Sequence, residues 1–216
     1  MTNSGLLIAS GLSSRINGFK PLLQYKDKSF LITIVNKLLS VLPKIVIVVG
    51  YNHGQLLDEL NKNFNGKLKQ TSNESWIIDD SIKIIYNKNF NEGMFSSLQL
   101  GVKELSDSDW ILYHFVDQPN IPKEFYRHFI EQQTKSYNWV QPLFKGVKGH
   151  PILFDKSVSK KINNAEASSN LREILKDESI KQFFWECDFP QILEDIDTDE
   201  DYQKFIVKDR IKQHNY

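Results

Sequence analysis

The sequence predicts an α/β protein, a three-layer α/β/α sandwich in which helices cover both faces of a mostly parallel sheet. Its short apolar runs lack the polar alternation of half-exposed strands, and strands covered on both faces are typical of parallel sheets. These runs alternate with segments of helical periodicity, and a strand–helix–strand alternation makes right-handed crossovers between parallel strands. The whole 216-residue chain therefore predicts one such layered fold.

The predicted elements follow one another in a regular order. GLLIAS (5–10) is the first apolar run, and in SFLITIVNKLLSVL (29–42) apolar residues recur about once per helical turn. KIVIVVG (44–50) and WILYHFVD (110–117) are the next two strands. The helices expected between and after them are 54–64, 95–105 and 123–133.

The pattern changes in the last third of the chain. Residues 138–155 contain two strand-like runs joined by a turn with glycine and lysine, which predicts a hairpin beside the main sheet. A polar helix is expected around 168–178, with Ser168 or Ser169 as its N-cap.

The final elements are a strand in IKQFFWECDF (180–189) and a helix that opens in DTDEDYQKFIVKD (197–209). The acids at the start of the second segment suit a helix N-terminus. No internal repeat, low-complexity tract or linker interrupts the chain, so we expect a single domain over residues 1–216.

Composition and charge narrow the classes of partner. Lys plus Arg and Asp plus Glu both number 27, so no overall field draws nucleic acid or an anionic membrane to the chain, and we expect neither partner. The single cysteine, Cys187, allows no internal disulfide and fits a reducing compartment. The N-terminal apolar run is too short for a signal peptide or membrane span, so the expected location is cytoplasmic.

The segment LIASGLSSRINGFKPLLQY (7–25) places a glycine, hydroxyls and two cations where the first strand ends. Ligands of open parallel sheets bind beyond the carboxyl ends of the strands. Gly11 lets backbone N–H groups approach a phosphate, Arg15 can grip phosphate oxygens, and Lys20 adds a mobile charge. The segment therefore indicates a site for a small anion, and a solvated surface loop is the alternative.

The commoner phosphate-binding patterns are absent from the sequence. It has no G-x-x-x-x-G-K-[ST] and no G-x-G-x-x-G after a strand, which argues against P-loop NTPases and dinucleotide dehydrogenases. It has no G-x-S-x-G and no H-E-x-x-H either. Serine hydrolases and zinc proteases are therefore disfavoured.

Asp117 follows the third central strand, at the same predicted sheet edge as Gly11. Magnesium is commonly held by one or two carboxylates together with phosphate oxygens. Asp195 or Asp197, from the late segment DIDTDED, would complete such a site. The alternatives are a loop-capping role for Asp117 and a solvated or helix-capping role for the late acids.

Two further segments have both a binding and a structural interpretation. NEGMFSSLQLGV (91–102) places Gly93 and Ser96 or Ser97 at the start of a helix, where free N–H groups attract anions or base edges. The alternative is a capped helix with Met94 and Phe95 as core residues. KGVKGHP either binds an anionic acceptor through its cations or uses His150 to hold a hairpin turn.

Taken in order, these segments resemble the nucleotidyltransferases that finish molybdenum cofactors, which include molybdopterin-guanine-dinucleotide synthases. The resemblance is closest to their molybdenum-cofactor cytidylyltransferase branch. The family pattern L-A-A-G-x-S-x-R-M-G-x-x-K-x-L-L stands here as IASGLSSRINGFKPLL, residues 8–23. The other matches are N-x-x-x-x-E-G-M-x-x-S-L at 87–98, D-Q-P at 117–119, G-H-P at 149–151 and D-I-D-T-x-E-D-Y at 195–202.

The resemblance implies a Rossmann-like fold of the nucleotide-diphospho-sugar transferase (GT-A) type, and it implies roles for the matched residues. Arg15, Lys20 and Asp117 would be catalytic, and Asp117 with Asp197 would hold Mg²⁺. Gly149, His150 and Pro151 would lie toward the acceptor. The NTP would contact Ile8, Ala9, Ser10, Gly11, Leu12, Ser13, Arg15, Lys20, Gly93 and Ser97, with Ala9, Ser10, Gly93 and Ser97 lining the base pocket.

The sequence departs from the family pattern at informative positions. Guanylyl-transferring relatives carry a second glycine before the loop glycine and the cytidylyl branch carries alanine, so Ser10 favours a small pyrimidine pocket. Ile16-Asn17 replaces Met-Gly after the loop arginine, and G-D-x-G-A-R reads ASSNLR over 167–172. The resemblance is therefore stronger for the nucleotide than for the acceptor.

The expected function is Mg²⁺-dependent transfer of CMP from CTP to a phosphorylated acceptor, molybdopterin, with release of pyrophosphate. A phosphate monoester is largely dianionic near pH 7, so its attack on the α-phosphorus needs no histidine base. The product would pass to a molybdenum hydroxylase. The alternatives are a nucleotidyltransferase for a sugar phosphate or another small phosphorylated alcohol, and a non-catalytic nucleotide-binding accessory protein for cofactor maturation.

Overall fold

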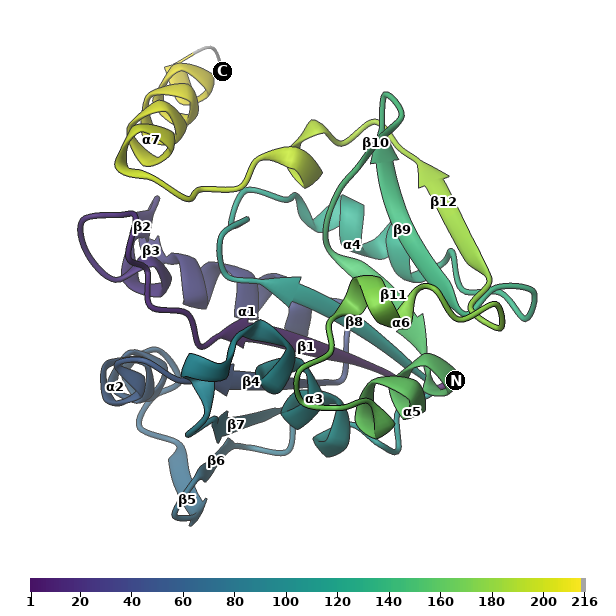
Figure 1. Ribbon diagram of the computed structural model, residues 1–216. Helices are drawn as coiled ribbons and strands as arrows, with labels where there is room; N and C mark the ends of the chain where they lie inside the picture. Colours follow the sequence, from purple (N-terminus) through teal and green to yellow (C-terminus); the bar gives the residue numbers. More distant parts are fainter. Residues whose placement is uncertain (215–216) are drawn as a thin grey trace.

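A ten-stranded sheet forms the centre of the computed structural model, which describes residues 1–214 of the chain and the side chains of residues 1–209 (Figure 1). β12 (Gln182–Glu186) pairs with β9, outside the linear order of the other strands. That order is β10 (Val147–Lys148), β9 (Trp139–Phe144), β11 (Ile152–Asp155), β8 (Trp110–Phe115), β1 (Asn3–Ala9), β4 (Lys44–Val49), β7 (Ile82–Tyr86), β6 (Ser75–Ile78) and β5 (Leu68–Ser72).

The four central strands β8, β1, β4 and β7 are parallel, whereas both flanks of the sheet are largely antiparallel. β6 pairs antiparallel with β7, and β11 pairs antiparallel with β8 and β9. β12 alone on that flank runs parallel to its neighbour, β9. The three strands expected from their apolar runs form the adjacent strands β8, β1 and β4, so their carboxyl ends meet at one edge.

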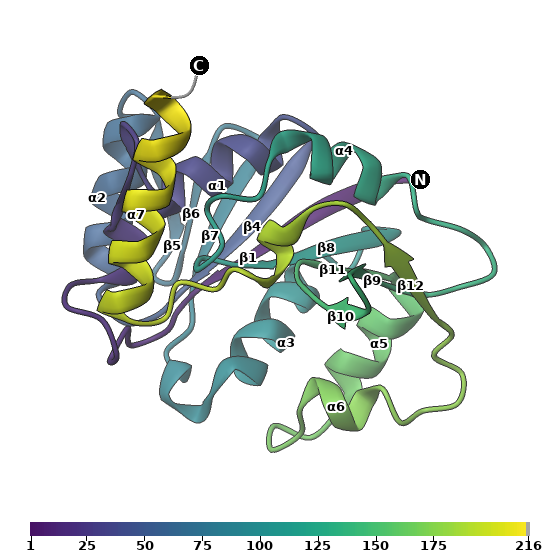
Figure 2. The same ribbon diagram turned by 90° about the horizontal axis from the view of Figure 1, so that it is seen from above.

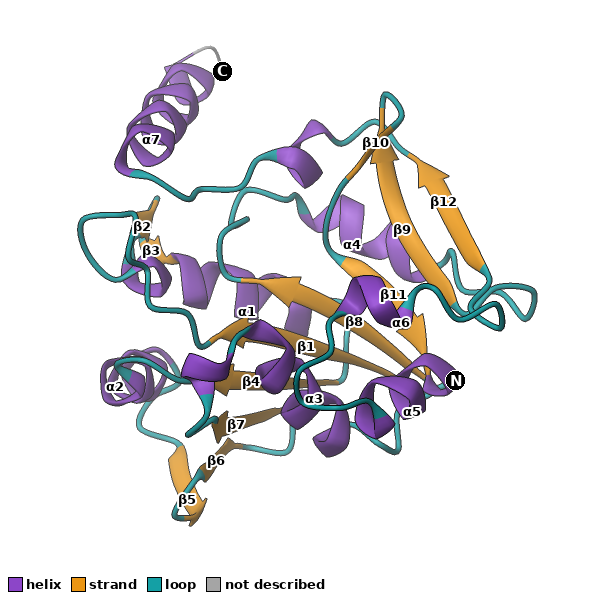
Figure 3. Cartoon of the chain, viewed as in Figure 1, coloured by secondary structure: helices purple, strands orange, loops and turns teal. Residues whose placement is uncertain are grey.

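Two layers of helices cover the sheet, as the view in Figure 2 shows. One layer contains α1 (Phe30–Leu39), α2 (His53–Asn63) and α4 (Lys123–Ile130), and the other contains α3 (Met94–Glu104), α5 (Lys156–Asn164) and α6 (Leu171–Ile174). The predicted three-layer α/β/α sandwich is therefore confirmed. Figure 3 also shows β2 (Gln24–Tyr25), β3 (Lys28–Ser29) and the C-terminal helix α7 (Asp199–His214). Three 3₁₀ turns complete the described elements: η1 (Lys20–Leu22), η2 (Phe90–Glu92) and η3 (Pro190–Leu193).

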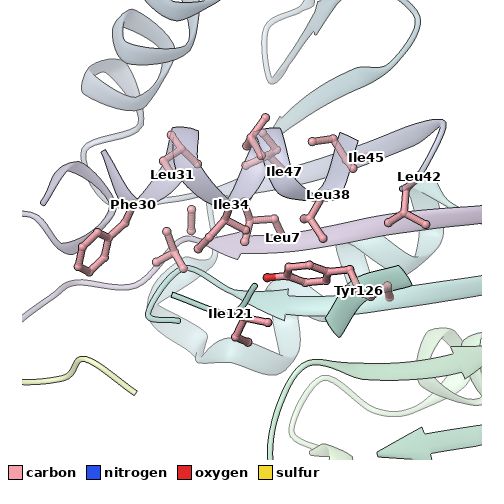
Figure 4. Close-up of a cluster of buried hydrophobic side chains, with 14 of the residues drawn as sticks. Leu7, Phe30, Leu31, Ile34, Leu38, Leu42, Ile45, Ile47, Ile121 and Tyr126 are labelled. Atoms are coloured by element: carbon pink, nitrogen blue, oxygen red, sulfur yellow. The ribbon is translucent and has the colours of Figure 1, made fainter. Parts of the chain in front are cut away.

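The alternation of side chains along each strand produces two hydrophobic cores. Leu7 belongs to the core beneath α1, where it lies near Ile34 and Leu38 (Figure 4). Leu6, its neighbour in β1, belongs to the core beneath α3. There α3 approaches closely, since a Cβ on Gly101 would lie 2.2 Å from Leu6 Cδ1. Because both faces of β1 are buried, successive residues such as Leu6 and Leu7 must both be apolar.

The structure corrects the helix expected at 168–178. Asp155 starts an unpredicted helix, α5, directly after β11, because its Oδ1 accepts the N–H groups of Ser157 (2.8 Å) and Val158 (3.1 Å). Only the short α6 lies inside the predicted range. Its N-cap is Asn170, which accepts from Glu173 N at 3.1 Å, so the assignment to Ser168 or Ser169 is wrong.

The hairpin expected within 138–155 is present, as β9 turns into β10 through two residues of positive φ, Lys145 (51°) and Gly146 (76°). The segment continues into β11, which joins the hairpin to the main sheet. The strands β5, β6 and β7 were not predicted. Within residues 1–214 no helix combines the length and apolarity needed to cross a bilayer.

Candidate active site

A cavity of about 500 Å³ opens at the carboxyl ends of β1 and β8. It gathers most of the predicted site residues from four separate parts of the chain. Ala9 and Ser97 are buried behind its wall, and residues 149–151 lie outside the lining. The predicted residues that line it are Ile8, Ser10, Gly11, Leu12, Ser13, Arg15, Lys20, Gly93, Asp117 and Asp197.

The two cations of the loop after β1 converge on one carboxylate. Lys20 Nζ lies 2.6 Å from Asp197 Oδ1, and Arg15 Nη2 lies 3.0 Å from Asp197 Oδ2. The Lys20 side chain is 12% exposed and that of Arg15 is 67% exposed, so the lysine is the fixed member and the arginine the accessible one. Partial burial opposes the shift, but the hydrogen bond and charge of Lys20, followed by Arg15, hold the pKa of Asp197 below its usual range.

The loop that carries these cations is tied down at several points. Ser13 adopts a left-handed backbone (φ 56°), and its Oγ accepts the Lys20 N–H at 3.1 Å. Asn17 donates both its backbone N–H (2.8 Å) and its Nδ2 (2.6 Å) to the carboxylate of Asp199, the first residue of α7. The loop therefore depends on the C-terminal helix, a contact that the sequence interpretation missed.

Asp117 lines the cavity with a carboxylate that is partly buried and, within residues 1–209, lacks a full set of hydrogen-bond partners. Its Oδ1 is buried and has no hydrogen-bond partner among the described residues. Burial raises the pKa of Asp117 to about 6, with Lys20 opposing this rise and Asp195 and Asp197 adding to it. A carboxylate held ionised in such a place calls for a cation.

Of the two late acids left open by the sequence, Asp197 lines the cavity, whereas Asp195 is outside its lining. Asp195 Oδ1 accepts from Gln118 Nε2 at 2.7 Å, and burial raises the pKa of Asp195. The same Nε2 also donates to the Ile192 carbonyl at 2.9 Å. Gln118 thus fixes the late segment against the loop that follows β8.

The side chains present can supply only part of the coordination of a magnesium ion, and a phosphorylated ligand would have to supply further oxygens. Within the described part of the chain, no group of three or more His, Cys, Asp or Glu side chains is placed to hold a metal. Magnesium in phosphate sites is usually bound by one or two carboxylates, with phosphate oxygens and water completing the octahedron. Asp117, with its unpartnered oxygen, and Asp197 on the same cavity satisfy that smaller requirement.

The segment expected to face the acceptor lies beside the cavity. The His150 ring packs edge-on against Phe115, which lines the cavity, with ring centroids 5.1 Å apart. Burial lowers the pKa of His150, with Asp195 opposing. A Cβ on Gly149 would lie 2.6 Å from the Ile192 carbonyl oxygen, so glycine is required where this segment passes η3.

The start of α3 forms another part of the cavity wall. Gly93 has φ 103° and ψ 174°, a conformation essentially restricted to glycine. Phe95 is buried as the structural interpretation expected, whereas Met94 is 55% exposed and lines the cavity. The interpretation of Met94 as a core residue is therefore wrong.

Lys37 is a supporting residue that the sequence interpretation missed because it lies within a helical pattern. Its Nζ donates to the carbonyls of Pro119 and Ile121, the latter at 2.8 Å, in the loop after Asp117. Burial, followed by the charges of Lys26 and Lys123, lowers the pKa of Lys37 to about 8. This lysine holds the loop that presents Asp117.

We expect Lys37 to make stability depend on pH between about pH 8 and pH 10. Its pKa is near 10.4 in an unfolded chain, so over that window the unfolded state binds more protons and the free energy of unfolding rises with pH. Below pH 8 both states are protonated and the contribution is constant. Lys37→Met should remove this rise, and at pH 10 it should lose about 1–3 kcal/mol through two unpaired carbonyls. At pH 7 the loss should be smaller, because the variant also lacks the cost of burying the charged ammonium. Urea unfolding from pH 7 to pH 10 measures both, and parallel curves for the two proteins would contradict the assignment.

The comparison with protein families gives this geometry a context. The family described as the MobA-like NTP transferase domain matches residues 5–182, which is most of the chain. The chain belongs to the MobA-like NTP transferase family. This MobA-like transferase is therefore an enzyme of the nucleotidyltransferase class, and the resemblance inferred from its motifs is confirmed.

Two curated relatives carry names that agree with the motifs. The molybdenum cofactor cytidylyltransferase of Escherichia coli (strain K12) is 24% identical over 197 residues, covering 91% of this chain and 92% of that protein. A probable molybdenum cofactor guanylyltransferase of Bacillus mycoides (strain KBAB4) is 28% identical over 150 residues, covering 69% of this chain and 66% of that protein.

A solved structure shows the same fold. A Mycobacterium tuberculosis H37Rv protein, described in complex with manganese, superposes with a TM-score of 0.66 at 14% identity. The match covers 94% of this chain and 97% of that chain. The expected nucleotide-diphospho-sugar transferase type of fold is confirmed.

Proposed function

We propose that this MobA-like transferase moves the CMP part of CTP onto the phosphate of molybdopterin, with Mg²⁺, and releases pyrophosphate. The observation that carries the proposal is the cavity itself, where Gly11, Arg15, Lys20 and Asp117 meet at the carboxyl ends of two parallel strands. That edge of an open sheet is where ligands bind. The name and near-complete coverage of the Escherichia coli relative support the same reaction.

In this reaction an oxygen of the acceptor phosphate attacks the α-phosphorus, and the bond from that phosphorus to the pyrophosphate oxygen breaks. The acceptor is already anionic, so the protein needs no general base. Its work is to align the reactants and to neutralise the charge that builds on the leaving pyrophosphate, for which Arg15 and Lys20 are placed. Asp117 and Asp197 would hold Mg²⁺, which supplies further positive charge beside the phosphates.

The ion pairs of Asp197 imply a rearrangement when CTP binds. Both carboxylate oxygens are engaged by Arg15 and Lys20 in the structure. Triphosphate oxygens compete for the same cations, so binding would release Asp197 from at least one of them. The Asp197 carboxylate then becomes available to a metal ion, so binding of CTP would favour binding of the metal.

Residues 167–172 depart from the family pattern on the acceptor side. His150 packs beside the cavity, but ASSNLR in the 167–172 segment keeps only Arg172 of the family pattern. Molybdopterin is proposed because both curated relatives are named for the molybdenum cofactor. We propose that the chain acts as one domain in the cytoplasm, where the buried free thiol of Cys187 stays reduced, and that a molybdenum hydroxylase receives the product.

The proposal is tested by thermal unfolding with CTP, GTP, UTP and ATP in the presence of Mg²⁺ or Mn²⁺, followed by pyrophosphate release with molybdopterin. A ligand that binds only the native state must raise the melting temperature. A selective shift with CTP and release that requires molybdopterin support the proposal. Release with a sugar phosphate would identify the alternative acceptor, a GTP-selective shift would overturn the base, and CTP binding without release would indicate an accessory protein.

Gly11→Ala should separate binding from folding. Gly11 has no positive φ, and an added Cβ would meet no described atom within 4 Å, so alanine fits the unliganded chain. The methyl group would instead stand where a phosphate approaches the backbone N–H groups. We expect an unchanged melting temperature and a CTP dissociation constant raised on the order of tenfold, about 1.4 kcal/mol.

Gly54→Ala is the matched control, since its Cβ also meets open space but lies in α2, away from the cavity. It should bind CTP normally and gain slightly in stability. Equal CTP affinity in the Gly11 and Gly54 variants would contradict phosphate binding by the loop.

A further inference from the structure

A line of hydrogen bonds runs from the cavity wall into the protein behind Ser10. Ser10 lines the cavity, and its Oγ lies 2.8 Å from the Oγ of Ser97, which is fully buried. Asn87 Nδ2 lies 2.8 Å from the same Ser97 oxygen. On its other side, Asn87 Oδ1 lies 2.9 Å from the backbone nitrogen of Asn89.

The direction of these bonds is set at Asn89. A backbone N–H can only donate, so the Asn87 atom that faces it is the amide oxygen. The amide nitrogen then points its two hydrogens at Ser97 Oγ and at Ser96 Oγ, the latter at 2.9 Å. Ser96 accepts one of them, because its own hydrogen is directed to the Gly93 carbonyl at 2.8 Å or the Asn89 carbonyl at 3.1 Å.

The donor–acceptor direction at Asn87 also determines the direction of the hydrogen bond between Ser97 and Ser10. Ser97 accepts from Asn87, and within residues 1–209 Ser10 Oγ is the other hydrogen-bond partner recorded for its side chain. A buried hydroxyl hydrogen without an acceptor costs about 1–3 kcal/mol, so Ser97 donates to Ser10. The hydrogen of Ser10 is then left to point into the cavity.

We propose that Asn87 is a positioning residue that makes Ser10 a hydrogen-bond donor toward the nucleobase. This inference rests on the proposed function and deepens its nucleotide site. The part of the base that meets Ser10 carries an acceptor, a carbonyl oxygen or a ring nitrogen, and cytosine offers both on adjacent atoms. An exocyclic amino group at that point would set two donors against each other.

Asn87→Asp is the decisive variant because it keeps the shape and reverses the direction. At an assay pH at which the new carboxyl group is ionised, it only accepts, so it still receives Asn89 N–H but now also receives the hydroxyl of Ser97. Ser10 then donates to Ser97 and presents only lone pairs to the base. The same reversal leaves contacts to the phosphates unchanged.

The experiment measures dissociation constants of CTP and of ribose 5-triphosphate, which lacks a base, for wild type, Asn87→Asp, Ser10→Ala and the double variant. Ser10→Ala should weaken CTP roughly threefold to tenfold, the value of one hydrogen bond. Asn87→Asp should weaken CTP at least as much, and the double variant should match Ser10→Ala. Ribose 5-triphosphate should bind all four proteins alike.

Two outcomes overturn the inference. If Asn87→Asp weakens the binding of CTP and of ribose 5-triphosphate equally, Asn87 has only a general structural effect. If Asn87→Asp weakens CTP binding as much in the Ser10→Ala protein as in wild type, its effect does not pass through Ser10. Wild type that binds neither triphosphate would instead overturn the proposed function. If Asn87→Asp melts below the assay temperature, Asn87→Leu replaces it, and its CTP affinity should lie between those of wild type and Ser10→Ala.

Discussion

Asp117→Asn is expected to lower the rate of pyrophosphate release by roughly a hundredfold to a thousandfold, the scale seen when one group that stabilises transition-state charge is removed. The amide keeps the shape of the side chain but loses the charge that would hold a metal. Steady-state release with CTP, Mg²⁺ and the acceptor measures the loss. Full activity in this variant would remove Asp117 from the reaction.

The same substitution should leave the fold intact and make it more stable near neutral pH. Burial raises the pKa of Asp117 to about 6, so the folded state holds this proton more tightly than the unfolded state, where the pKa is near 3.9. The ionised carboxylate therefore costs stability, a cost that grows from about pH 4 to pH 6 and is then constant. Denaturation at pH 4.5 and pH 7.5 should show the larger gain for Asp117→Asn at pH 7.5.

Lys20→Met should have the second-largest effect, a loss of kcat/KM on the order of a hundredfold. Lys20 is the less exposed of the two loop cations, and its ammonium lies 2.6 Å from Asp197. The substitution removes a fixed positive charge from the phosphate site and leaves Asp197 with Arg15 alone. Because both substrates are phosphorylated, the loss should include a higher KM for CTP.

The control for Lys20 is Lys28→Met in the β2–β3 hairpin. Lys28 is exposed and, within residues 1–209, it has no recorded ion pair or side-chain hydrogen bond. The variant changes the net charge equally, so it should retain nearly full activity. A similar loss in both variants would mean that overall charge matters and that the loop site does not.

The central strands were predictable because the apolar residues that favour a strand locally are also the residues that burial in the sheet requires. β1, β4 and β8 are buried on both faces over most of their length, so their sequences are largely apolar and each can be identified as a strand without knowledge of its partner. The hairpin β5–β6 is different. β5 is largely exposed, reads LKQTS, and lies at the edge of the sheet, so its sequence carries little burial pattern.

Of the candidate site, the loop after β1 could be predicted from its own spacing and Asp117 from the predicted sheet edge, whereas Asp197 and Gly93 follow from the family resemblance. Arg15 and Lys20 lie in one loop with a glycine, and this pattern indicated an anion. The contacts that organise the site join distant segments instead, as in the bonds from Asn17 to Asp199 and from Lys37 to the loop after Asp117. No spacing along the chain encodes such pairs, because the fold alone decides which residues meet.

The pairing of the loop after β1 with the segment before α7 also sets a time order during synthesis. The strands β8, β1, β4 and β7 are complete once residue 115 has been made, but Arg15 and Lys20 are separated from Asp197 by 182 and 177 residues. At about 5–20 residues per second, Asp197 follows Arg15 by roughly 10 to 40 seconds. A nascent chain therefore contains the four parallel strands before it contains Asp197, so Arg15 and Lys20 meet their carboxylate partner only after the strands that present them have been made.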